Sequence, residues 1–204
     1  MKTPPNPPRL LDLARAHWRP ARLDEATLLI VDAQREYADG GLSLPGLDRA
    51  ADEIAQLLAR ARQSGAPIIH VVQHARQPGA AIFNPQGRFV EILPPLTPRP
   101  GETVIVKHLP NSFADTTLAP TLRATRRRQL IVVGFMTHMC VSTTVRAALD
   151  HGYPCTVVAG ACATRDLPDG GGGVIPAATV HRVALAALAD RFAEVVPLAT
   201  ALRD

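Results

Sequence analysis

The amino-acid sequence predicts an α/β fold in which helices cover both faces of a mainly parallel sheet. Apolar runs such as residues 27–31 lack polar alternation, which is typical of strands buried on both faces. Stretches with helical spacing of apolar residues separate these runs. The 204 residues, 47% of them hydrophobic, are enough for one domain with a full core. We expect a three-layer α/β/α domain over 23–204, preceded by a Pro-rich tail (3–8) and a short helix within residues 1–22.

The order of elements along the chain predicts the topology of the sheet. Right-handed crossovers between successive strands favour the strand order 3-2-1-4-5-6. In this order the chain reverses direction between the first and fourth strands, and ligands bind outside the carboxyl ends of strands at such a point. Strands are expected over 27–31, 67–73, 103–106, 129–133, 155–159 and 193–196, and helices over 10–17, 47–63, 117–126, 140–151 and 175–192.

Three connections are expected to carry specificity, because long loops in compact domains are often functional. They span 35–45, 73–101 and 164–175. The last contains the glycine run Gly170–Gly173, which lacks the flanking pattern of a phosphate-binding loop. We interpret this run as a flexible flap or a linker before the last helix.

Charge and composition limit the possible binding partners of the protein and its cellular location. The net charge of +4 arises largely from Arg123 and Arg126–Arg128, which we interpret as a solvated helix end. Only 4% of residues are aromatic and no nucleic-acid-binding motif is present, so no nucleic-acid partner is expected. The sequence has neither a run of about 18 apolar residues nor a signal peptide, which predicts a cytoplasmic protein without a membrane partner. Three cysteines without secretion signals argue against a disulfide framework.

Three reactive side chains follow three different predicted strands. Alone, Asp32 would be a turn former, Lys107 a solvated lysine and Cys140 a small buried thiol. Together they lie at one edge of one sheet. A carboxylate can act as a base, an ammonium favours a thiolate, and a helix N-terminus stabilises negative charge on Cys140. The sequence therefore predicts a nucleophilic cysteine site, whereas the absence of a GxSxG motif disfavours a serine hydrolase.

Several motifs around these residues resemble those of a known family. They are DAQREY after the first strand, GFMTHMCVSTTVR after the fourth, and ATRDLP with VHRVALAALADRF further on. Over about residues 27–192 the chain resembles the isochorismatase-like cysteine hydrolases, which include nicotinamidases and N-carbamoylsarcosine amidases. The resemblance implies a triad of Asp32, Lys107 and Cys140. It also implies a cis peptide between Phe135 and Met136, and an oxyanion site formed by the backbone N–H groups of Met136 and Cys140.

The resemblance implies hydrolysis of a small amide-like substrate through a thioester, without a cofactor, by a homo-oligomer that is a dimer or larger. Nicotinamidases bind a metal near the first two strands; here only His70 and His74 are candidates, so no metal site is expected. An isochorismate-type vinyl-ether hydrolase is one alternative. In true isochorismatases, however, the position of Cys140 is often not cysteine. A non-catalytic binding protein with the same fold is the other alternative.

The substrate pocket is expected to involve side chains near the triad. Gln34 and Tyr37 follow Asp32 closely, and Phe113 and Phe135 could supply apolar walls. Loop packing explains Gln34 and Tyr37 equally well. His138 could be a second base, although a role in the turn explains it as well.

Overall fold

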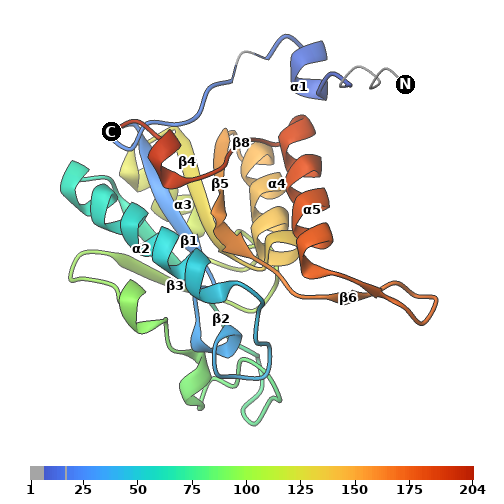
Figure 1. Ribbon diagram of the computed structural model, residues 1–204. Helices are drawn as coiled ribbons and strands as arrows, with labels where there is room; N and C mark the ends of the chain where they lie inside the picture. Colours follow the sequence, from blue (N-terminus) through green and yellow to red (C-terminus); the bar gives the residue numbers. More distant parts are fainter. Residues whose placement is uncertain (1–6, 17) are drawn as a thin grey trace.

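A six-stranded sheet forms the centre of the protein, in the spatial order β3-β2-β1-β4-β5-β8 (Figure 1). The computed structural model describes residues 7–16 and 18–204. All neighbouring strands are parallel. The predicted order is confirmed, because β8 is the sixth strand expected from the sequence. The strands are β1 (Ala26–Val31), β2 (Ile68–Gln73), β3 (Thr103–Lys107), β4 (Gln129–Phe135), β5 (Cys155–Ala163) and β8 (Ala193–Val196).

Helices cover both faces of the sheet, which confirms the three-layer α/β/α architecture. Helix α2 (Leu47–Ser64) lies on one face, in front of the sheet in Figure 1. The other face is covered by α3 (Leu118–Thr125), α4 (Ser142–Asp150) and α5 (Ala177–Arg191). Within residues 7–16 and 18–204, no helix combines the length and the apolar character needed to cross a membrane.

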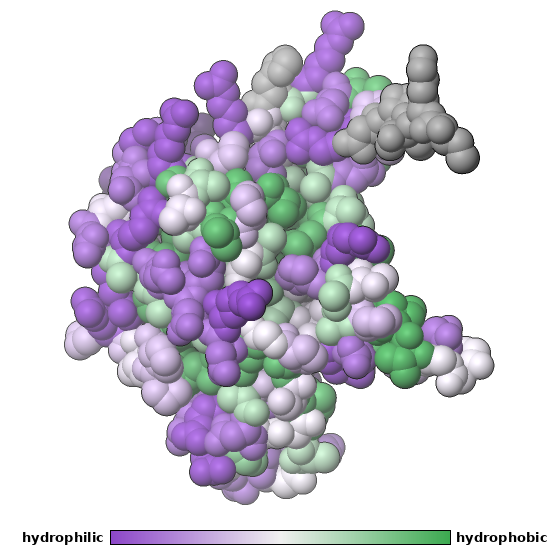
Figure 2. Space-filling view, in the orientation of Figure 1, coloured by the Kyte–Doolittle hydropathy of each residue, from purple (hydrophilic) through white to green (hydrophobic). Residues whose placement is uncertain are grey.

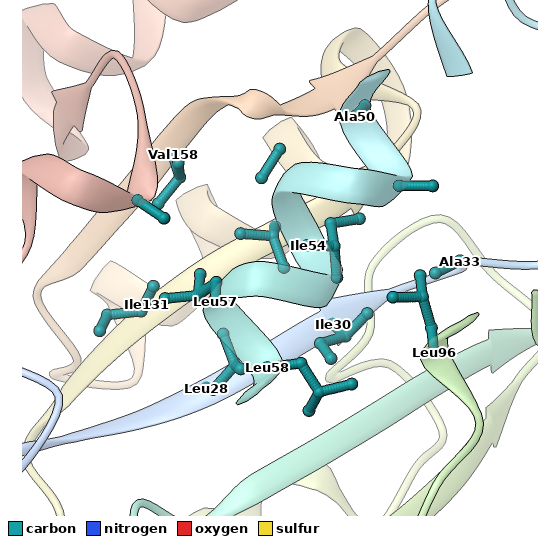
Figure 3. Packing of buried hydrophobic residues seen from close by; sticks show 14 of the residues in the cluster. Leu28, Ile30, Ala33, Ala50, Ile54, Leu57, Leu58, Leu96, Ile131 and Val158 are labelled. Carbon is teal, nitrogen blue, oxygen red and sulfur yellow. The ribbon is translucent and has the colours of Figure 1, made fainter. Parts of the chain in front are cut away.

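The strands are apolar on both sides because each side faces a helical layer. Leu28 and Ile30 of β1 belong to the cluster beneath α2, where Figure 3 shows them close to Ile54, Leu57 and Leu58. The alternate residues of β1 belong to the cluster on the opposite face. Burial of each such side chain contributes about 1.5–3 kcal/mol. Packing on both faces explains why the strands show no polar alternation.

The helix expected over 140–151 is α4 (Ser142–Asp150) together with the π turn that precedes it. A wide π turn, Thr137–Val141, leads directly into α4. The carbonyl of Met136 accepts the N–H groups of Met139 at 3.0 Å and Val141 at 3.3 Å, which closes this turn. Cys140 therefore lies inside the π turn, two residues before α4 begins and thus near its expected position at the start of the helix.

The N-terminal segment packs against the rest of the chain. The expected helix over 10–17 is a single turn, α1 (Leu10–Leu13). The N–H of Leu10 donates to Asp190 of α5 at 2.8 Å, and Arg9 pairs with Glu194 of β8 at 3.1 Å. Residues 1–6, which include most of the Pro-rich stretch, lie outside the described residues.

The glycine run Gly170–Gly173 forms the tip of a small antiparallel hairpin between β6 (Leu167–Pro168) and β7 (Val174–Ile175). The hairpin projects from the body of the protein (Figure 1). Figure 2 shows a mostly hydrophilic surface with an apolar patch on this projection, and Val174 is 66% exposed. The Asp169 carboxylate accepts two of the glycine N–H groups, at 2.7 and 2.8 Å. The run is thus a hairpin tip, and its interpretation as a linker is wrong.

Gly134 allows the carboxyl ends of β1 and β4 to lie in contact. It pairs with Val31 across the two strands and has a φ of +118°. A Cβ atom at this position would lie 2.0 Å from the carbonyl oxygen of Val31. Since Asp32 follows Val31 and Phe135 follows Gly134, this close approach also sets the spacing of the site described below.

We predict that Gly134→Ala lowers the free energy of unfolding by roughly 3–5 kcal/mol, because the methyl group must displace the backbone of β1 and the φ angle is unfavourable. Urea denaturation measures the effect. Gly152→Ala is the matched control, since Gly152 also has a positive φ but no atom lies within 4 Å of the position that its methyl group would take. The control should lose only about 1–2 kcal/mol. Equal losses in the two variants would contradict the steric explanation.

Candidate active site

Asp32 lies directly after β1, at the carboxyl edge of the sheet. Its backbone has a φ of +50°, a left-handed conformation that aspartate tolerates better than most residues. The Asp32 N–H continues the sheet by donating to Val71 at 2.8 Å, and its carbonyl accepts the N–H of Gln34 at 2.8 Å. The strand thus ends in a tight turn, and the carboxylate is completely buried.

Lys107 is the last residue of β3 and reaches past β2 to the end of β1. Its buried Nζ lies 2.7 Å from Asp32 Oδ2, 2.6 Å from Gln73 Oε1 and 3.3 Å from Cys140 Sγ. An ammonium has three N–H donors, so each of the three can be directed at one neighbour. The structure therefore brings together the three residues predicted from the sequence, and it adds Gln73.

Burial keeps Cys140 protonated. Desolvation, followed by the charge of Asp32, raises the pKa of the Cys140 thiol to about 12, although Lys107 acts in the opposite direction. Burial thus opposes the shift toward the thiolate that a helix N-terminus was expected to favour. A base must remove the thiol proton before the sulfur becomes a strong nucleophile.

The adjacent carboxylate is suited to act as that base. Desolvation raises the pKa of Asp32 above the ordinary aspartate value, and the Lys107 charge only partly opposes this shift. A carboxylate with a higher proton affinity accepts a proton from a thiol more readily. Burial thus disfavours both the Asp32 carboxylate and the Cys140 thiolate relative to their protonated forms.

The backbone at the end of β4 offers a hydrogen-bond donor close to the thiol. The peptide bond between Phe135 and Met136 is cis. The N–H of Met136 has no acceptor in the part of the chain that the structure describes. A free N–H four residues before Cys140 is consistent with the expected oxyanion site, which stays a prediction.

Two of the four expected pocket residues form an aromatic group next to the reactive side chains. The Tyr37 ring packs edge-on against Phe135, with centroids 5.7 Å apart, and against Phe83, at 5.6 Å. Burial, followed by the charges of Asp32 and Cys140, raises the pKa of Tyr37 well above its ordinary value. Phe83 was not predicted, because its loop has no periodic pattern that would indicate which residues turn inward.

The other two expected pocket residues have different partners. The Gln34 side chain accepts the N–H of Gln73 at 2.8 Å and donates to the carbonyls of Gln73 at 3.0 Å and Val90 at 2.9 Å. Its amide group is thus fully occupied by hydrogen bonds to backbone groups. The Phe113 ring stacks on His151, with centroids 4.4 Å apart. These contacts occupy both side chains, and their place in the substrate pocket stays a prediction.

Two of the histidines expected near the site, His138 and His70, contact side chains outside the reactive triad. His138 Nδ1 lies 2.5 Å from Thr164 Oγ1, which follows β5, and the roles of His138 as a second base or in the turn stay predictions. His70 is buried in β2 and contacts Glu102 at 3.1 Å. Burial lowers the pKa of both His70 and His74. Across residues 7–16 and 18–204, no three His, Cys, Asp or Glu side chains are grouped as a metal would require.

The reactive cluster is nearly closed to solvent. Asp32 and Lys107 are fully buried, and Cys140 is only 6% exposed. A cavity of about 970 Å³ lies at the opposite end of the sheet, where Gln129 and Cys155 begin their strands.

A thiol beside a buried carboxylate and ammonium, at the carboxyl edge of a parallel α/β sheet, is an arrangement that can activate a cysteine nucleophile. The isochorismatase domain model matches residues 26–200. The chain therefore belongs to the isochorismatase family of hydrolases, as its motifs suggest.

Similar proteins have related folds and different named activities. An isochorismatase from Pseudomonas putida KT2440 superimposes with a TM-score of 0.91 at 46% identity, covering 97% of this chain and 100% of that one. A secreted isochorismatase effector of Verticillium dahliae is 39% identical, covering 86% of this chain and 90% of its own length.

Two further relatives are named for other hydrolytic reactions. Streptothricin hydrolase of Streptomyces noursei is 38% identical and covers 86% of this chain and 63% of its own length. Ureidoacrylate amidohydrolase of Variovorax paradoxus is 27% identical and covers 89% of this chain and 86% of its own length. The family thus includes hydrolases of different substrates, and the substrate of this chain has to be argued from its own site.

We predict that iodoacetamide alkylates Cys140 at least about tenfold faster than Cys155 or Cys162 near neutral pH, because only Cys140 has an adjacent base. The other two thiols are internal controls. All three are buried, with exposures of 6%, 3% and 5%, and burial raises the pKa of each to about 12. Peptide mass spectrometry measures the three rates. Equal labelling would show that the cluster does not activate Cys140.

The same reaction should slow as the solution is acidified. Protonated Asp32 cannot accept the thiol proton, and burial raises the pKa of Asp32 above its ordinary value of 3.8. The midpoint of the loss in alkylation rate at Cys140 is therefore expected above that pH. A midpoint at or below 3.8 would contradict the burial effect.

Proposed function

We propose that this protein hydrolyses a small amide-like substrate by covalent catalysis, with Cys140 as nucleophile, Asp32 as proton acceptor and donor, and Lys107 as the fixed positive charge. The observation that carries the proposal is the contact of one buried ammonium with both other groups, 2.7 Å from Asp32 and 3.3 Å from Cys140. A nucleophile, a base and an orienting charge within hydrogen-bond reach are the usual signature of nucleophilic catalysis.

In the first half of the reaction, Asp32 takes the Cys140 proton while Sγ attacks the carbonyl carbon. The carbonyl π electrons move onto oxygen, and the N–H groups of Met136 and Cys140 stabilise this oxyanion. One such donor typically contributes about 10²–10³ in rate. The tetrahedral intermediate then collapses, the C–N bond breaks, and the leaving nitrogen takes the proton from Asp32. The products of this half are a thioester on Cys140 and a free amine or ammonia.

In the second half, water replaces the amine. Asp32 accepts a proton from the attacking water, whose oxygen bonds to the thioester carbon. Collapse of this intermediate breaks the C–S bond, and the thiolate recovers its proton from Asp32. Lys107 offsets the negative charge that passes between Asp32 and Cys140 in both halves, and it carries no proton away.

An amide-like substrate is favoured by both the chemistry and the relatives. A thiol nucleophile suits attack on a carbonyl carbon, which a vinyl ether lacks. The ureidoacrylate amidohydrolase is named for cleavage of a C–N bond, and the streptothricin hydrolase is a second hydrolase outside isochorismate chemistry. The aromatic group of Tyr37, Phe83 and Phe135 would favour a substrate with a planar or apolar part.

Isochorismate-type vinyl-ether hydrolysis is the alternative. It is favoured by the names of the Pseudomonas and Verticillium relatives, which are both described as isochorismatases. Such a reaction needs a proton donor and no sulfur nucleophile, so it would leave Cys140 dispensable. The expected homo-oligomer, the cytoplasmic location and the absence of nucleic-acid and membrane partners stay predictions.

We predict that Cys140→Ala lowers ammonia release from an amide panel that includes ureidoacrylate by at least about 10⁴-fold, because no other group can form the thioester. Cys155→Ala is the matched control, since it also removes a buried thiol but at the opposite end of the sheet, and it should keep wild-type turnover. Full activity of Cys140→Ala would refute covalent catalysis. Isochorismate turnover by that variant, with no amide cleaved by the wild type, would establish the ether hydrolase.

Dialysis against EDTA should leave amide hydrolysis unchanged. In the proposed reaction Lys107 and backbone N–H groups supply the positive potential, and the two candidate metal ligands, His70 and His74, do not converge on the cluster. Ammonia release before and after dialysis measures the effect. A loss of activity that added Zn²⁺ or Mn²⁺ restores would contradict the proposed chemistry.

A further inference from the structure

We propose that Gln73 is a positioning residue that fixes the Lys107 ammonium between Asp32 and Cys140. This inference rests on the proposed function, and it concerns a residue that the sequence analysis did not single out. Gln73 is the last residue of β2, the strand that separates β3 from β1 in the sheet. Its side chain therefore lies at the same sheet edge as the three reactive groups.

The Gln73 side chain contacts the Lys107 ammonium directly. Gln73 Oε1 accepts a hydrogen bond from Lys107 Nζ at 2.6 Å, and Lys107 is fully buried. The ammonium has only three N–H donors, and its other two neighbours are Asp32 and Cys140. Gln73 and Cys140 each accept a hydrogen bond from Nζ, and the Asp32 carboxylate lies 2.7 Å from Nζ as its ion-pair partner. The contact with Gln73 thus helps to hold Nζ between the carboxylate and the sulfur.

The orientation of the Gln73 amide is itself fixed. Its Nε2 donates to the carbonyl of His74 at 3.2 Å, so the oxygen of the same amide must face Lys107. The Gln73 backbone is held at both ends by the Gln34 side chain, through its N–H at 2.8 Å and its carbonyl at 3.0 Å. Gln34 also binds the carbonyl of Val90 at 2.9 Å. A pair of glutamines thus connects the ends of β1 and β2 to the long loop.

Gln73 suits this positioning role because its side chain is uncharged. A carboxylate in its place would attract the same ammonium and weaken the Asp32–Lys107 pair. It would also place a second negative charge beside groups whose charged forms are already disfavoured by burial. An amide supplies the acceptor without that charge.

The groups that titrate around the cluster are known from the structure. Asp32 and Cys140 contact Lys107 directly, and Tyr37 is close enough to both that their charges raise its pKa. His74 follows Gln73 and His108 follows Lys107, and the His108 ring contacts the His74 carbonyl at 2.9 Å. Burial and His108 lower the pKa of His74, so His74 is neutral at pH 7.

Two substitutions separate positioning from simple support of the fold. Gln73→Met removes the acceptor at similar volume and should lower kcat of amide hydrolysis by about 10²-fold with little change in KM, because the reactive groups are misaligned. Gln73→Glu keeps an oxygen acceptor but adds a charge. It should move the acid midpoint of Cys140 alkylation by iodoacetamide upward by roughly one pH unit, because a nearby negative charge raises the pKa of Asp32.

Gln56→Met, on the exposed face of α2, is the matched control and should behave as the wild type in both assays. Melting temperatures of all variants check folding. Wild-type kcat in Gln73→Met would overturn the inference. A lower melting temperature in Gln73→Glu with an unchanged acid midpoint would also overturn it, because that result describes a merely structural residue. Activity that survives Cys140→Ala would instead refute the proposed function, so the two failures are distinguishable.

Discussion

The buried ion pair between Asp32 and Lys107 is the interaction on which the site depends. Removing two charges from water is costly, and the cost is offset only when the partners meet in good geometry with their remaining hydrogen-bonding groups satisfied. Here Lys107 Nζ and Asp32 Oδ2 are 2.7 Å apart and both side chains are fully buried, but Asp32 Oδ1 has no hydrogen-bond partner among the described residues, so the cost is only partly offset. The pair joins β3 to β1 across β2, so it forms only when three strands end in register. The topology of the sheet is thus a condition for the chemistry.

The same burial decides how the thiol is used. It raises the pKa of Cys140 to about 12 and also raises that of Asp32. Burial thus favours a neutral thiol in the resting site, in contrast to cysteine enzymes that store a thiolate. In the proposed reaction, the sulfur becomes nucleophilic only as its proton moves to Asp32 during attack. There Lys107 would offset the negative charge on either partner, which would make the proton transfer reversible and allow the second half of the reaction.

Much of the fold and the three reactive residues could be predicted from the sequence. Strands buried on both faces give continuous apolar runs, and the first polar residue after such a run lies at the edge where ligands bind. Asp32 and Lys107 were found in this way. Gln73 ends β2 in the same manner and could have been found by the same rule. It was missed because a glutamine at a strand end carries no distinctive chemistry until its partner is known.

Other features could not be derived from sequence patterns. The π turn around Cys140 depends on how Met136 accepts two backbone N–H groups, and the periodicity of an ordinary helix conceals it. The role of Phe83 depends on the path of a long irregular loop. The hairpin at Gly170–Gly173 has strands of only two residues each, too short for an alternation to be visible.

Covalent acylation of Cys140 during turnover is the step on which the proposed reaction depends. Rapid acid quenching of the enzyme with an amide that it hydrolyses, followed by intact-protein and peptide mass spectrometry, detects this step. We expect an adduct on Cys140 equal in mass to the acyl part of the substrate without its leaving amine. The adduct should form and decay at rates compatible with kcat. Steady turnover with no adduct at any quench time, or with an adduct on another residue, would contradict the proposed reaction.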